Sequence, residues 1–502
     1  MALRTVDQFK GSLRDDRVYV LGERVDDVTT HPMLQIVTDH AANVYHLARD
    51  PRFEDLFTFI SPETGEQVSR YFMQPSDGKE LQLRGDLIEE HTRQGKSTLN
   101  LTKAVGTDAL LALALVSQQV DRALGTGYAA RVGAFLSHCR ENDLSMALAQ
   151  TDVKGDRSRR PHEQADPDLY VRVVERKDDG IVVCGAKAHT TMAPVVNEII
   201  VIPSRAMSAA DGDYAVAFAV PPATRGLTMI CRPTTTIDQS PFDFPISRTN
   251  IETETLTVFD NVFVPWERVF LCGEWQFAGA LATGFATYHR FTAVSYKPPI
   301  ADLFIGAAQL AAEYHGLENV SHIREKVAQL VHYAEVIRAC RKAAAFECSR
   351  LDSGQAIPNS VYTNAGKYHF ASHFHEMVKL VQDIAGGLVI TLPTEKDYNN
   401  PETRQYIERY LAGRAGVPTE HKLRIFSLIK DLTATDFGGY NSVVTLHGEG
   451  SLAAQMIAIT RDYDLNRCKQ LAEEAAGIAG PASSPSPLAG VEFSPHQARP
   501  QG

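Results

Sequence analysis

Cysteine is absent from the first 138 residues of this 502-residue chain. The seven cysteines stand further along, at positions 139, 184, 231, 272, 340, 348 and 468, and no two of them form a CxxC pair. An odd number of cysteines without paired spacing argues against a disulfide framework. It is typical of a reduced, cytoplasmic protein.

Excess positive charge, long apolar runs and a leader pattern are also missing. The formal net charge is −11, which argues against nucleic acid as the main partner, because phosphate binding needs a basic face. No window approaches eighteen uncharged apolar residues, so we expect no membrane span. The first residues, MALRTVDQFKGSLRDD, are polar and charged, and we expect no secretory signal.

The short motifs of several large enzyme classes are absent too. There is no GxGxxG, no P-loop and no GxSxG, so Rossmann and hydrolase interpretations have no support. His369 and His373 share a helix face, but no placed carboxylate accompanies them, and we expect no metal site. With 44% apolar and 22% charged residues, the chain is an ordinary globular protein of two or three domains.

Three regions with different patterns of apolar residues follow one another along the chain. Residues 1–148 carry apolar residues at helical spacing, as in TDALLALALVSQQVDRAL, and predict a helical domain. Residues 149–275 alternate around turns such as KDDG and predict a β domain of roughly seven strands. Residues 276–480 hold long amphipathic segments that predict a four-helix bundle. Residues 481–502 are rich in Pro, Ser and Gly and predict a disordered tail. The fold class is therefore α+β.

A polar turn, TDVKGDR, lies at 151–157, between the predicted helical region and the predicted β region. Ligands prefer such domain junctions. Backbone N–H groups around Gly155 can cradle an anion, and Lys154 or Arg157 can add positive charge. A solvated connector explains the same residues equally well, so both interpretations stay open.

Three other stretches have two interpretations each. Thr190 in GAKAHTT either hydrogen-bonds an acceptor-rich ring such as flavin or simply ends a strand. Gly386 and Gly387 in QDIAGG form a helix C-cap, or they let the backbone approach a cofactor closely. HGEGS at 447–451 is either a turn or a loop that touches a cofactor.

Two single residues carry ionisable groups. His289, in TYHRF, stands alone and is more often structural than catalytic. Glu254, in NIETETLTVF, is most simply an exposed strand carboxylate. Neither residue predicts a catalytic site without its surroundings.

The chain resembles one superfamily in the order and spacing of TDVKGDR, GAKAHTT, NEIIVIPSRAM, FDNVFVPWERVF, YHR, QDIAGGLVITLPTEKD, GVPTEHKLRIFSLIKDLT and HGEGS. That superfamily contains the large component of flavin-dependent 4-hydroxyphenylacetate 3-monooxygenases and the 4-hydroxybutyryl-CoA dehydratases. The resemblance covers about residues 1–480 and is closer to the dehydratases. It implies an acyl-CoA-dehydrogenase-like fold with an N-terminal helical domain, a middle β-barrel and a C-terminal four-helix bundle. It also implies FAD in the cleft and a homotetramer.

The same resemblance implies a set of site residues. His289 and Glu254 would be catalytic, and Arg157 and Tyr296 would meet the substrate. The residues implied to lie along the flavin, or for those after residue 380 along the flavin or the tetramer interface, are Thr151, Asp152, Lys154, Gly155, Thr190, Gln382, Gly386, Gly387, Gly448 and Ser451.

The chain departs from the dehydratases at their metal centre. They hold a [4Fe–4S] cluster through three cysteines and one histidine. The histidine matches His289, but two of the cysteines belong before TDALLALA, where this chain has none, and the third falls at Tyr296. Because a cluster needs thiolate ligands, we expect no iron–sulfur cluster and no dehydration that depends on one. A second family glutamate, shortly before the HG of HGEGS, is replaced by an apolar residue around Val443 or Val444.

The hydroxylases are not matched cleanly either, since their phenol-binding Arg and Tyr fall at Val105 and Ala109. We nevertheless predict a two-component monooxygenase. A partner flavin reductase would supply reduced FAD, and one oxygen of O₂ would be transferred to an aromatic or other electron-rich small molecule. The alternative is a cluster-free acyl-CoA isomerase or dehydratase-like enzyme in which His289 and Glu254 move a proton beside FAD. A third possibility is a flavin-binding paralogue without catalysis.

Overall fold

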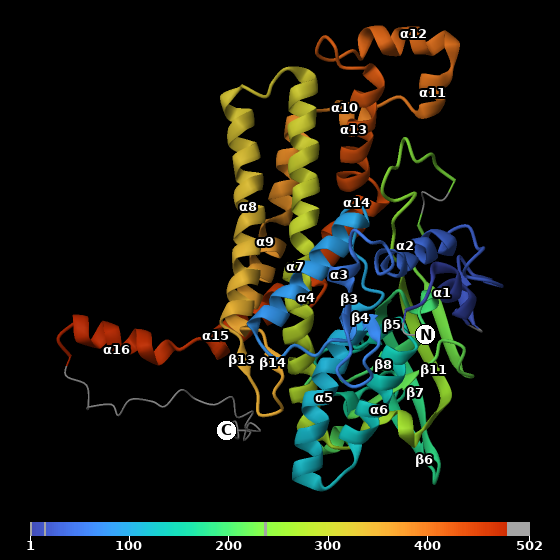
Figure 1. The fold of residues 1–502 in the computed structure, drawn as a ribbon, viewed down its shortest axis with the longest axis vertical. Helices are drawn as coiled ribbons and strands as arrows, with labels where there is room; N and C mark the ends of the chain where they lie inside the picture. Colours follow the sequence, from blue (N-terminus) through green and yellow to red (C-terminus); the bar gives the residue numbers. More distant parts are fainter. Residues whose placement is uncertain (1–2, 15–16, 235–237, 479–502) are drawn as a thin grey trace.

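The computed structural model describes residues 3–14, 17–234 and 238–478, so the predicted tail lies outside the described residues (Figure 1). Helices dominate the part before the sheets. The Asp77 side chain caps one of them, α4, by accepting a hydrogen bond from the Glu80 backbone at 2.9 Å. Gly125 ends another, α5, with a left-handed backbone. The bounds are α1 (Val6–Ser12), α2 (Leu34–Leu47), α3 (Glu54–Phe57), α4 (Gly78–Gln94), α5 (Ala104–Leu124) and α6 (Tyr128–Glu141).

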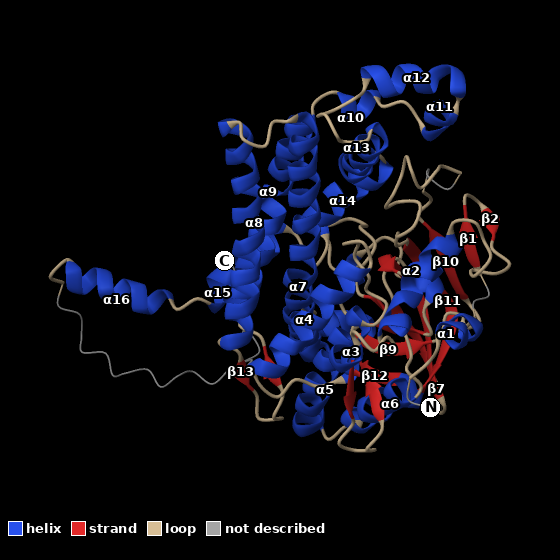
Figure 2. Cartoon of the chain, turned by 45° about the horizontal axis from the view of Figure 1, so that its top comes forward, coloured by secondary structure: helices blue, strands red, loops and turns tan. Residues whose placement is uncertain are grey.

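Two larger sheets form the middle region of the chain, and their strands lie to one side of the long helices (Figure 2). The six-stranded sheet has the order β2-β1-β10-β11-β7-β6, and the four-stranded sheet has the order β12-β9-β8-β5. Strand β1 comes from the mostly helical first region and pairs in parallel with β10, Val18 opposite Met229. The bounds are β1 (Val18–Val20), β2 (Glu23–Arg24), β5 (Met146–Ala149), β6 (Arg172–Arg176), β7 (Gly180–Thr191), β8 (Glu198–Val201), β9 (Val216–Val220), β10 (Leu227–Cys231), β11 (Glu254–Pro265) and β12 (Val269–Cys272).

The middle region is not the closed β-barrel that the resemblance implied. No ladder between named strands in the described ranges joins the two sheets. The sheets instead contact each other through β5 and β7 and through β9 and β11, while α5 covers β5 and β8. Each sheet can therefore bury its apolar face against the other sheet or a helix without closing on itself.

Long helices form the C-terminal part (Figure 1). Helices α7, α8 and α9 pack against one another, and α13 packs against α7 and α9. Helix α7 also contacts α4 and α5, so it lies between the N-terminal helices and the bundle. The bounds are α7 (Trp275–His315), α8 (Ser321–Phe346), α9 (Ser360–Ala385), α10 (Leu388–Thr391), α11 (Glu395–Asn399), α12 (Pro401–Tyr410), α13 (Thr419–Thr433), α14 (Asp436–His447), α15 (Leu452–Asp462) and α16 (Leu465–Ala475).

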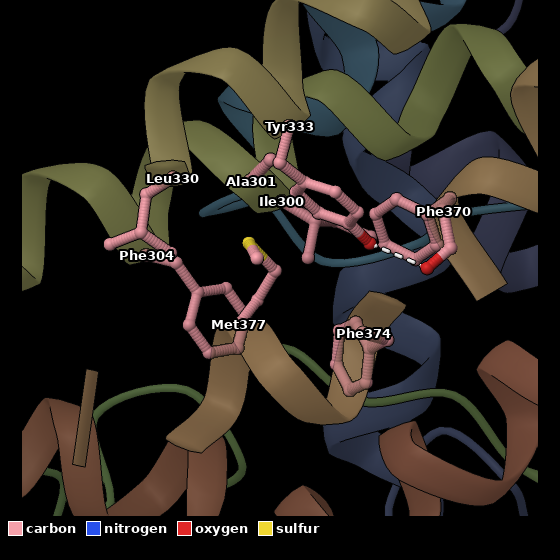
Figure 3. Close-up of a pocket in the computed structure, with 8 residues that line it drawn as sticks. All are labelled: Ile300, Ala301, Phe304, Leu330, Tyr333, Phe370, Phe374 and Met377. Atoms are coloured by element: carbon pink, nitrogen blue, oxygen red, sulfur yellow. Dashed lines mark hydrogen bonds between the residues drawn. The ribbon is translucent and has the colours of Figure 1, made fainter. Parts of the chain in front are cut away.

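The bundle core between α7, α8 and α9 is apolar and tightly closed. Figure 3 shows Phe304, Phe374 and Met377 among the side chains that line a gap in this core, and the gap is too narrow to admit water. The Tyr333 hydroxyl donates to the Phe370 carbonyl at 2.7 Å, so its one polar atom is satisfied. This gap is a packing feature and not a ligand cavity.

Helix α16 projects from the body of the molecule in both ribbon views. None of its residues is buried, and Leu471 is 68% exposed. A helix of this length is marginal in water without a partner surface. Across the described ranges, we find no helix that combines the length and apolarity needed to span a membrane.

Candidate acid–base site

Two glutamates meet at the start of strand β11. Glu252 and Glu254 are two residues apart, the spacing that puts side chains on one face of an extended chain. The Tyr440 hydroxyl of α14 lies 2.9 Å from Glu252 Oε1 and 3.0 Å from Glu254 Oε1. Thr191 Oγ1 also donates to Glu254 Oε1 at 2.9 Å. One phenol proton cannot satisfy two ionised carboxylates, so the pair retains a further proton.

Burial favours the protonated form of both carboxyl groups. Burial and, after it, the neighbouring Glu254 raise the pKa of Glu252 to about 8. Burial also raises the pKa of Glu254, against the hydrogen bonds from Thr191 and Tyr440. Both Oε2 atoms are buried and have no hydrogen-bond partner within the described ranges. Such an orphan acceptor is unfavourable by about 1–3 kcal/mol, and a bound ligand would relieve it.

A third buried glutamate, Glu449, lies in the loop between α14 and α15. Its backbone has φ 54°, a left-handed conformation that is strained for any residue except glycine. Its Oε1 accepts a hydrogen bond from the Tyr296 hydroxyl, and its Oε2 lies 3.1 Å from Lys297 Nζ. Lys367 Nζ of α9 is 3.7 Å from the same Oε2. The side chains of Glu449, Lys297 and Lys367 are 4%, 2% and 0% exposed.

Two lysines therefore share a single carboxylate. Burial and the neighbouring Lys367 hold the pKa of Lys297 well below its ordinary value. Burial, with a smaller effect of Arg290, lowers the pKa of Lys367 to about 7. Burial and Glu252 raise the pKa of Glu449 to about 8. Because burial disfavours every charged form here, protons can move among these groups near neutral pH.

The two clusters influence each other and form one site. Glu252 raises the pKa of Glu449, and Lys297 acts on the pKa of Glu252 in the opposite direction. The groups come from β11, α7, α9, α14 and the loop after α14, so the tertiary fold assembles them. The name acid–base site is used below for Glu252, Glu254, Tyr296, Lys297, Lys367, Tyr440 and Glu449.

His289 lies on α7, seven residues before Tyr296 and so about two helical turns away on a similar face. Its Nδ1 is 3.1 Å from Asp108 Oδ2. Asp108 Oδ1 accepts hydrogen bonds from Arg84 Nη2 at 2.7 Å and from Thr292 Oγ1 at 2.9 Å. Asp108 thus fixes the ring and leaves Nε2 as the nitrogen that can meet a ligand.

The first half of the polar turn at 151–157 has a structural role. Asp152 Oδ1 pairs with Lys187 Nζ at 2.6 Å, and its Oδ2 accepts a hydrogen bond from the Ser204 hydroxyl. The Thr151 carbonyl accepts a hydrogen bond from the Ala188 backbone at 2.9 Å. These contacts fasten the turn to strand β7 and explain Asp152 without a ligand.

Basic side chains gather at the second half of the turn. The side chains of Lys154, His189 of β7 and His447 of α14 are exposed. Partial burial and then the charges of Lys154 and His447 lower the pKa of His189. Gly155 has φ 52°, and a Cβ there would come within 2.5 Å of Leu169. The turn therefore requires glycine, and the three basic side chains can hold an anionic group.

The basic run after the turn is partly neutralised. Arg157 is exposed, whereas Arg160 pairs with the buried Asp211 at 2.8 Å.

Thr190 is fully buried, and its Oγ1 accepts a hydrogen bond from Thr257 Oγ1 at 3.0 Å. The observed contact of Thr190 is thus with a neighbouring strand.

The predicted residues after position 380 fall into two groups. Gly448 and Ser451 flank Glu449, and Ser451 caps α15 through the Ala454 backbone at 3.3 Å. Gln382 lies fifteen residues after Lys367 on α9, about 22 Å along the helix. It donates to the Thr433 carbonyl at 3.2 Å, and Gly386, followed by Gly387, ends α9 with φ 74°. Within one chain, this second group lies away from the acid–base site.

The donor atoms do not fit an iron–sulfur cluster. In the described part of the chain, no group of three or more His, Cys, Asp or Glu side chains is arranged to hold a metal ion. A cluster needs thiolate ligands, whereas His289 is engaged by Asp108 and the Tyr296 hydroxyl by Glu449. The absence of a cluster stays a prediction, now with a stated chemical reason.

Two family models match nearly the whole chain. One is described as 4-hydroxyphenylacetate 3-hydroxylase N terminal and matches residues 5–271; the other is described as its C terminal and matches residues 278–477. The chain belongs to the 4-hydroxyphenylacetate 3-hydroxylase family. This membership confirms the superfamily that the sequence motifs indicated.

Relatives of both kinds occur in this 4-hydroxyphenylacetate 3-hydroxylase family. The 4-hydroxybutyryl-CoA dehydratase/vinylacetyl-CoA-Delta-isomerase of Clostridium aminobutyricum is 35% identical, over 95% of this chain and 100% of that protein. The solved oxygen-tolerant archaeal 4-hydroxybutyryl-CoA dehydratase of N. maritimus has a TM-score of 0.91 at 33% identity, covering 97% of each chain. The oxygenase component of 4-hydroxyphenylacetate 3-monooxygenase complexed with FAD has a TM-score of 0.87 at 27% identity, covering 95% of this chain and 99% of that one. These structures confirm the mixed α+β fold.

Sequence reasoning named Glu254 and Tyr296 but missed the other five members of the acid–base site, which are Glu252, Lys297, Lys367, Tyr440 and Glu449. Glu252 has a signal, because it precedes Glu254 by the two-residue period of a strand. Glu449 stands inside HGEGS, yet the sequence interpretation assigned the second glutamate's position to apolar residues near Val443. Val443 is 60% exposed, whereas Glu449 is buried in the site. Lys367 gives no sequence signal, since a lysine on a helix is usually solvated.

Proposed function

We propose that this chain is a flavin-dependent isomerase that moves a proton, and with it a carbon–carbon double bond, in a short acyl-CoA thioester. The observation that carries the proposal is the buried pair Glu252 and Glu254, with orphan oxygens beside a second proton-holding cluster at Glu449. Proton removal next to a thioester carbonyl needs a base in a site that excludes water. The name of the clostridial relative includes vinylacetyl-CoA isomerisation.

FAD is the cofactor that we propose for the junction. The basic groups of Lys154, His189 and His447 fit an anionic diphosphate, and the glycine that the turn requires at Gly155 allows close backbone approach. The FAD complex of the related oxygenase component supports this proposal. When bound, FAD supplies an electron-accepting ring next to the substrate.

The protein's own groups divide into a base and an acid. An ionised Glu254 takes the proton from the carbon next to the thioester carbonyl, while Glu252 holds the proton that the pair must retain. A protonated group of the Glu449 cluster returns a proton at the far carbon of the shifted double bond. His289 Nε2, oriented by Asp108, can donate a hydrogen bond to the substrate.

The same arrangement separates isomerisation from dehydration. The seven residues of the acid–base site include no cysteine to supply a thiolate, but they include the carboxyl groups for a proton shift. We therefore expect the enzyme to isomerise an unsaturated acyl-CoA and to leave a 4-hydroxyacyl-CoA unchanged.

Incubation of the FAD-loaded protein with vinylacetyl-CoA in deuterated buffer tests the proposal. Mass spectrometry should show the conjugated but-2-enoyl isomer with deuterium at the far carbon. Incubation with 4-hydroxybutyryl-CoA should give no dehydrated product. An unchanged vinylacetyl-CoA pool would contradict the isomerase, and dehydration of 4-hydroxybutyryl-CoA would contradict the absence of a cluster.

A two-component monooxygenase, which the sequence interpretation favoured, is the second candidate. The match to the FAD-bound oxygenase component along 95% of this chain favours it. A separate flavin reductase would supply reduced FAD, and a buried carboxylate or His289 would deprotonate an aromatic small-molecule substrate. Oxygen consumption with chemically reduced FAD and a panel of phenols tests it. A hydroxylated product would establish this function, and oxygen uptake unaffected by every phenol would exclude those substrates.

Assembly and location stay proposals. The exposed Leu471 on the projecting α16 supports contact with another copy of the chain, as the predicted homotetramer requires. Gln382, Gly386 and Gly387 would then meet a neighbouring subunit or its flavin. Light scattering of the purified protein tests the tetramer, and a monomer would contradict it. The cytoplasmic location rests on the cysteine pattern alone.

A further inference from the structure

The hydroxyl of Tyr296 lies in a buried cluster of hydrogen bonds with Lys297 and Glu449. We propose that Tyr296 is the catalytic acid of the isomerisation and that Lys297, Glu449 and Lys367 form its proton supply. This inference rests on the proposed function and names the acid that the proposed function leaves open. Tyr296 lies about two turns from His289 on a similar face of α7, so both side chains point toward the same part of the site.

The contacts around Tyr296 are those of a hydroxyl that exchanges its proton. Its Oη donates to Glu449 Oε1 and accepts a hydrogen bond from Lys297 Nζ at 2.8 Å. Lys297 Nζ also lies 3.1 Å from Glu449 Oε2, so the three groups form a closed ring of hydrogen bonds. Loss of the phenol proton would therefore leave an oxygen that still accepts from an ammonium group.

Basic groups around this ring can stabilise the phenolate that forms when Tyr296 gives up its proton. Lys297, Lys367 and Arg290 are all basic, and Glu449 is the one carboxylate in direct contact with the two lysines among the described residues. Arg290 Nε donates to the Glu449 carbonyl at 2.9 Å. Glu252, the acidic group facing the ring from β11, belongs to the substrate base. With more basic than acidic groups, the ring can hold the negative charge that appears on Tyr296 after proton donation.

The loop that supplies Glu449 is held in an unfavourable conformation. Glu449 has φ 54°, and the next residue, Gly450, has φ 101°. A Cβ at Gly450 would come within 2.7 Å of the Arg290 guanidinium. The protein thus places a carboxylate against Tyr296 despite backbone strain of about 1–3 kcal/mol, as is common at functional sites.

The proposed step balances in atoms and charge. The carboxylate of Glu254 forms an O–H bond with the proton that leaves the carbon next to the thioester. The double bond shifts, and the far carbon forms a C–H bond with the proton from Tyr296, whose O–H electron pair stays on oxygen. Lys297 then reprotonates Tyr296 and regains a proton from Glu449 or Lys367. Release of the Glu254 proton to solvent and uptake of one by the ring complete the cycle without an oxidant.

Replacement of Tyr296 by phenylalanine removes the proposed acid and little else. Tyr296→Phe should lower kcat by about 10²–10⁴-fold and change KM much less. Tyr333→Phe is the matched control, because it deletes the hydroxyl of another buried tyrosine in the same bundle. That control should keep wild-type kcat. A Tyr296→Phe enzyme with wild-type kcat would overturn the proposal. If Tyr296→Phe fails to fold, Glu449→Gln tests the ring, with the same direction expected.

Replacement of Lys367 separates proton supply from packing. Lys367→Met keeps the length of the buried side chain but removes its ammonium group, and should lower kcat by about 10-fold with little effect on KM. Lys422→Met is the control, since Lys422 is 6% exposed and its Nζ contacts the Ala412 carbonyl at 3.5 Å. Equal kcat values in the two variants would remove Lys367 from the proton supply.

A measurement on the unloaded protein needs neither FAD nor substrate. In protein labelled with fluorotyrosine, the ¹⁹F resonance lost in Tyr296→Phe identifies Tyr296. Lys367→Met should shift that resonance, and Lys422→Met should not. An unshifted resonance would overturn the shared proton ring. If the wild type isomerises no acyl-CoA but the resonance shifts, the proposed function and the acid role of Tyr296 are wrong, whereas the shared hydrogen-bond ring is supported. The two failures can therefore be distinguished.

Discussion

Two buried networks on helix α7 differ in how completely their charges are paired. Around Asp108, one carboxylate faces Arg84 and His289, and each of its oxygens has a partner. In the acid–base site, by contrast, two lysines share Glu449, while Glu252 and Glu254 keep buried oxygens without a partner in the described ranges.

This difference in charge pairing indicates that the two networks have different roles. A carboxylate with both oxygens paired, such as that of Asp108, mainly fixes geometry. An incompletely paired network is unfavourable in the empty protein, but a ligand can complete it. We therefore expect substitutions near Asp108 to act on stability and substitutions in the acid–base site to act on turnover.

The largest effect should come from Glu254→Gln, which removes the base but keeps the shape of the side chain. We expect kcat to fall by about 10²–10⁴-fold in the isomerase assay, with little loss of thermal stability. Glu267→Gln, at an exposed glutamate after the same strand, should behave as the wild type. A Glu254→Gln enzyme that unfolds early and keeps kcat would assign Glu254 to structure.

Arg84→Met should break the network around Asp108 instead. Arg84 is 2% exposed and pairs with the fully buried Asp108, so its loss leaves an uncompensated charge. We expect the free energy of unfolding to fall by about 3–5 kcal/mol in denaturant titrations. Arg93→Met on the same helix removes a half-exposed partner of Glu90 and should change stability by less than about 1 kcal/mol. Similar losses of unfolding free energy in Arg84→Met and Arg93→Met would contradict a special structural role for the Asp108 network.

The pH dependence of stability should sharpen the contrast. The pKa of Glu252 is raised from 4.5 to about 8, so the folded state keeps a proton that the unfolded chain has released in this range. Its contribution is complete below about pH 4.5 and is lost as the pH rises toward 8. Glu252→Gln should remove this loss, which amounts to at most about 1.4 kcal/mol per pH unit. Urea unfolding across this range measures it, with the exposed Glu473→Gln as the control. Parallel curves for wild type and Glu252→Gln would contradict the buried proton.

The smallest effect should come from the polar turn. Gly155→Ala forces a side chain into a left-handed position against Leu169, so we expect FAD affinity to weaken by about 1–3 kcal/mol in a fluorescence titration. Gly133→Ala is the control, because a Cβ at that position of α6 meets nothing within 4 Å. An unchanged FAD affinity in Gly155→Ala would return the turn to a solvated connector.

Local patterns predicted much of the fold because they act over a few residues. Helical spacing identified the segment that became α5 and predicted long helices within residues 276–480, and alternation around KDDG identified the β6–β7 hairpin. The closed barrel was wrong, because closure depends on whether the edge strands meet, which no short segment encodes. Within the site, Glu254 and Tyr296 were named as site residues only through resemblance. The two-residue spacing could have indicated Glu252, but no local pattern indicated Lys367.

By itself, the sequence determined the family and the broad order of helical and β regions. Only the tertiary structure decided that Glu252, Lys367 and Glu449 face one another, since more than eighty residues of chain separate each from the next. Their altered pKa values arise from burial and from charges on distant segments. Those causes exist only once the chain has folded, which is why the candidate chemistry could not be read from the residues alone.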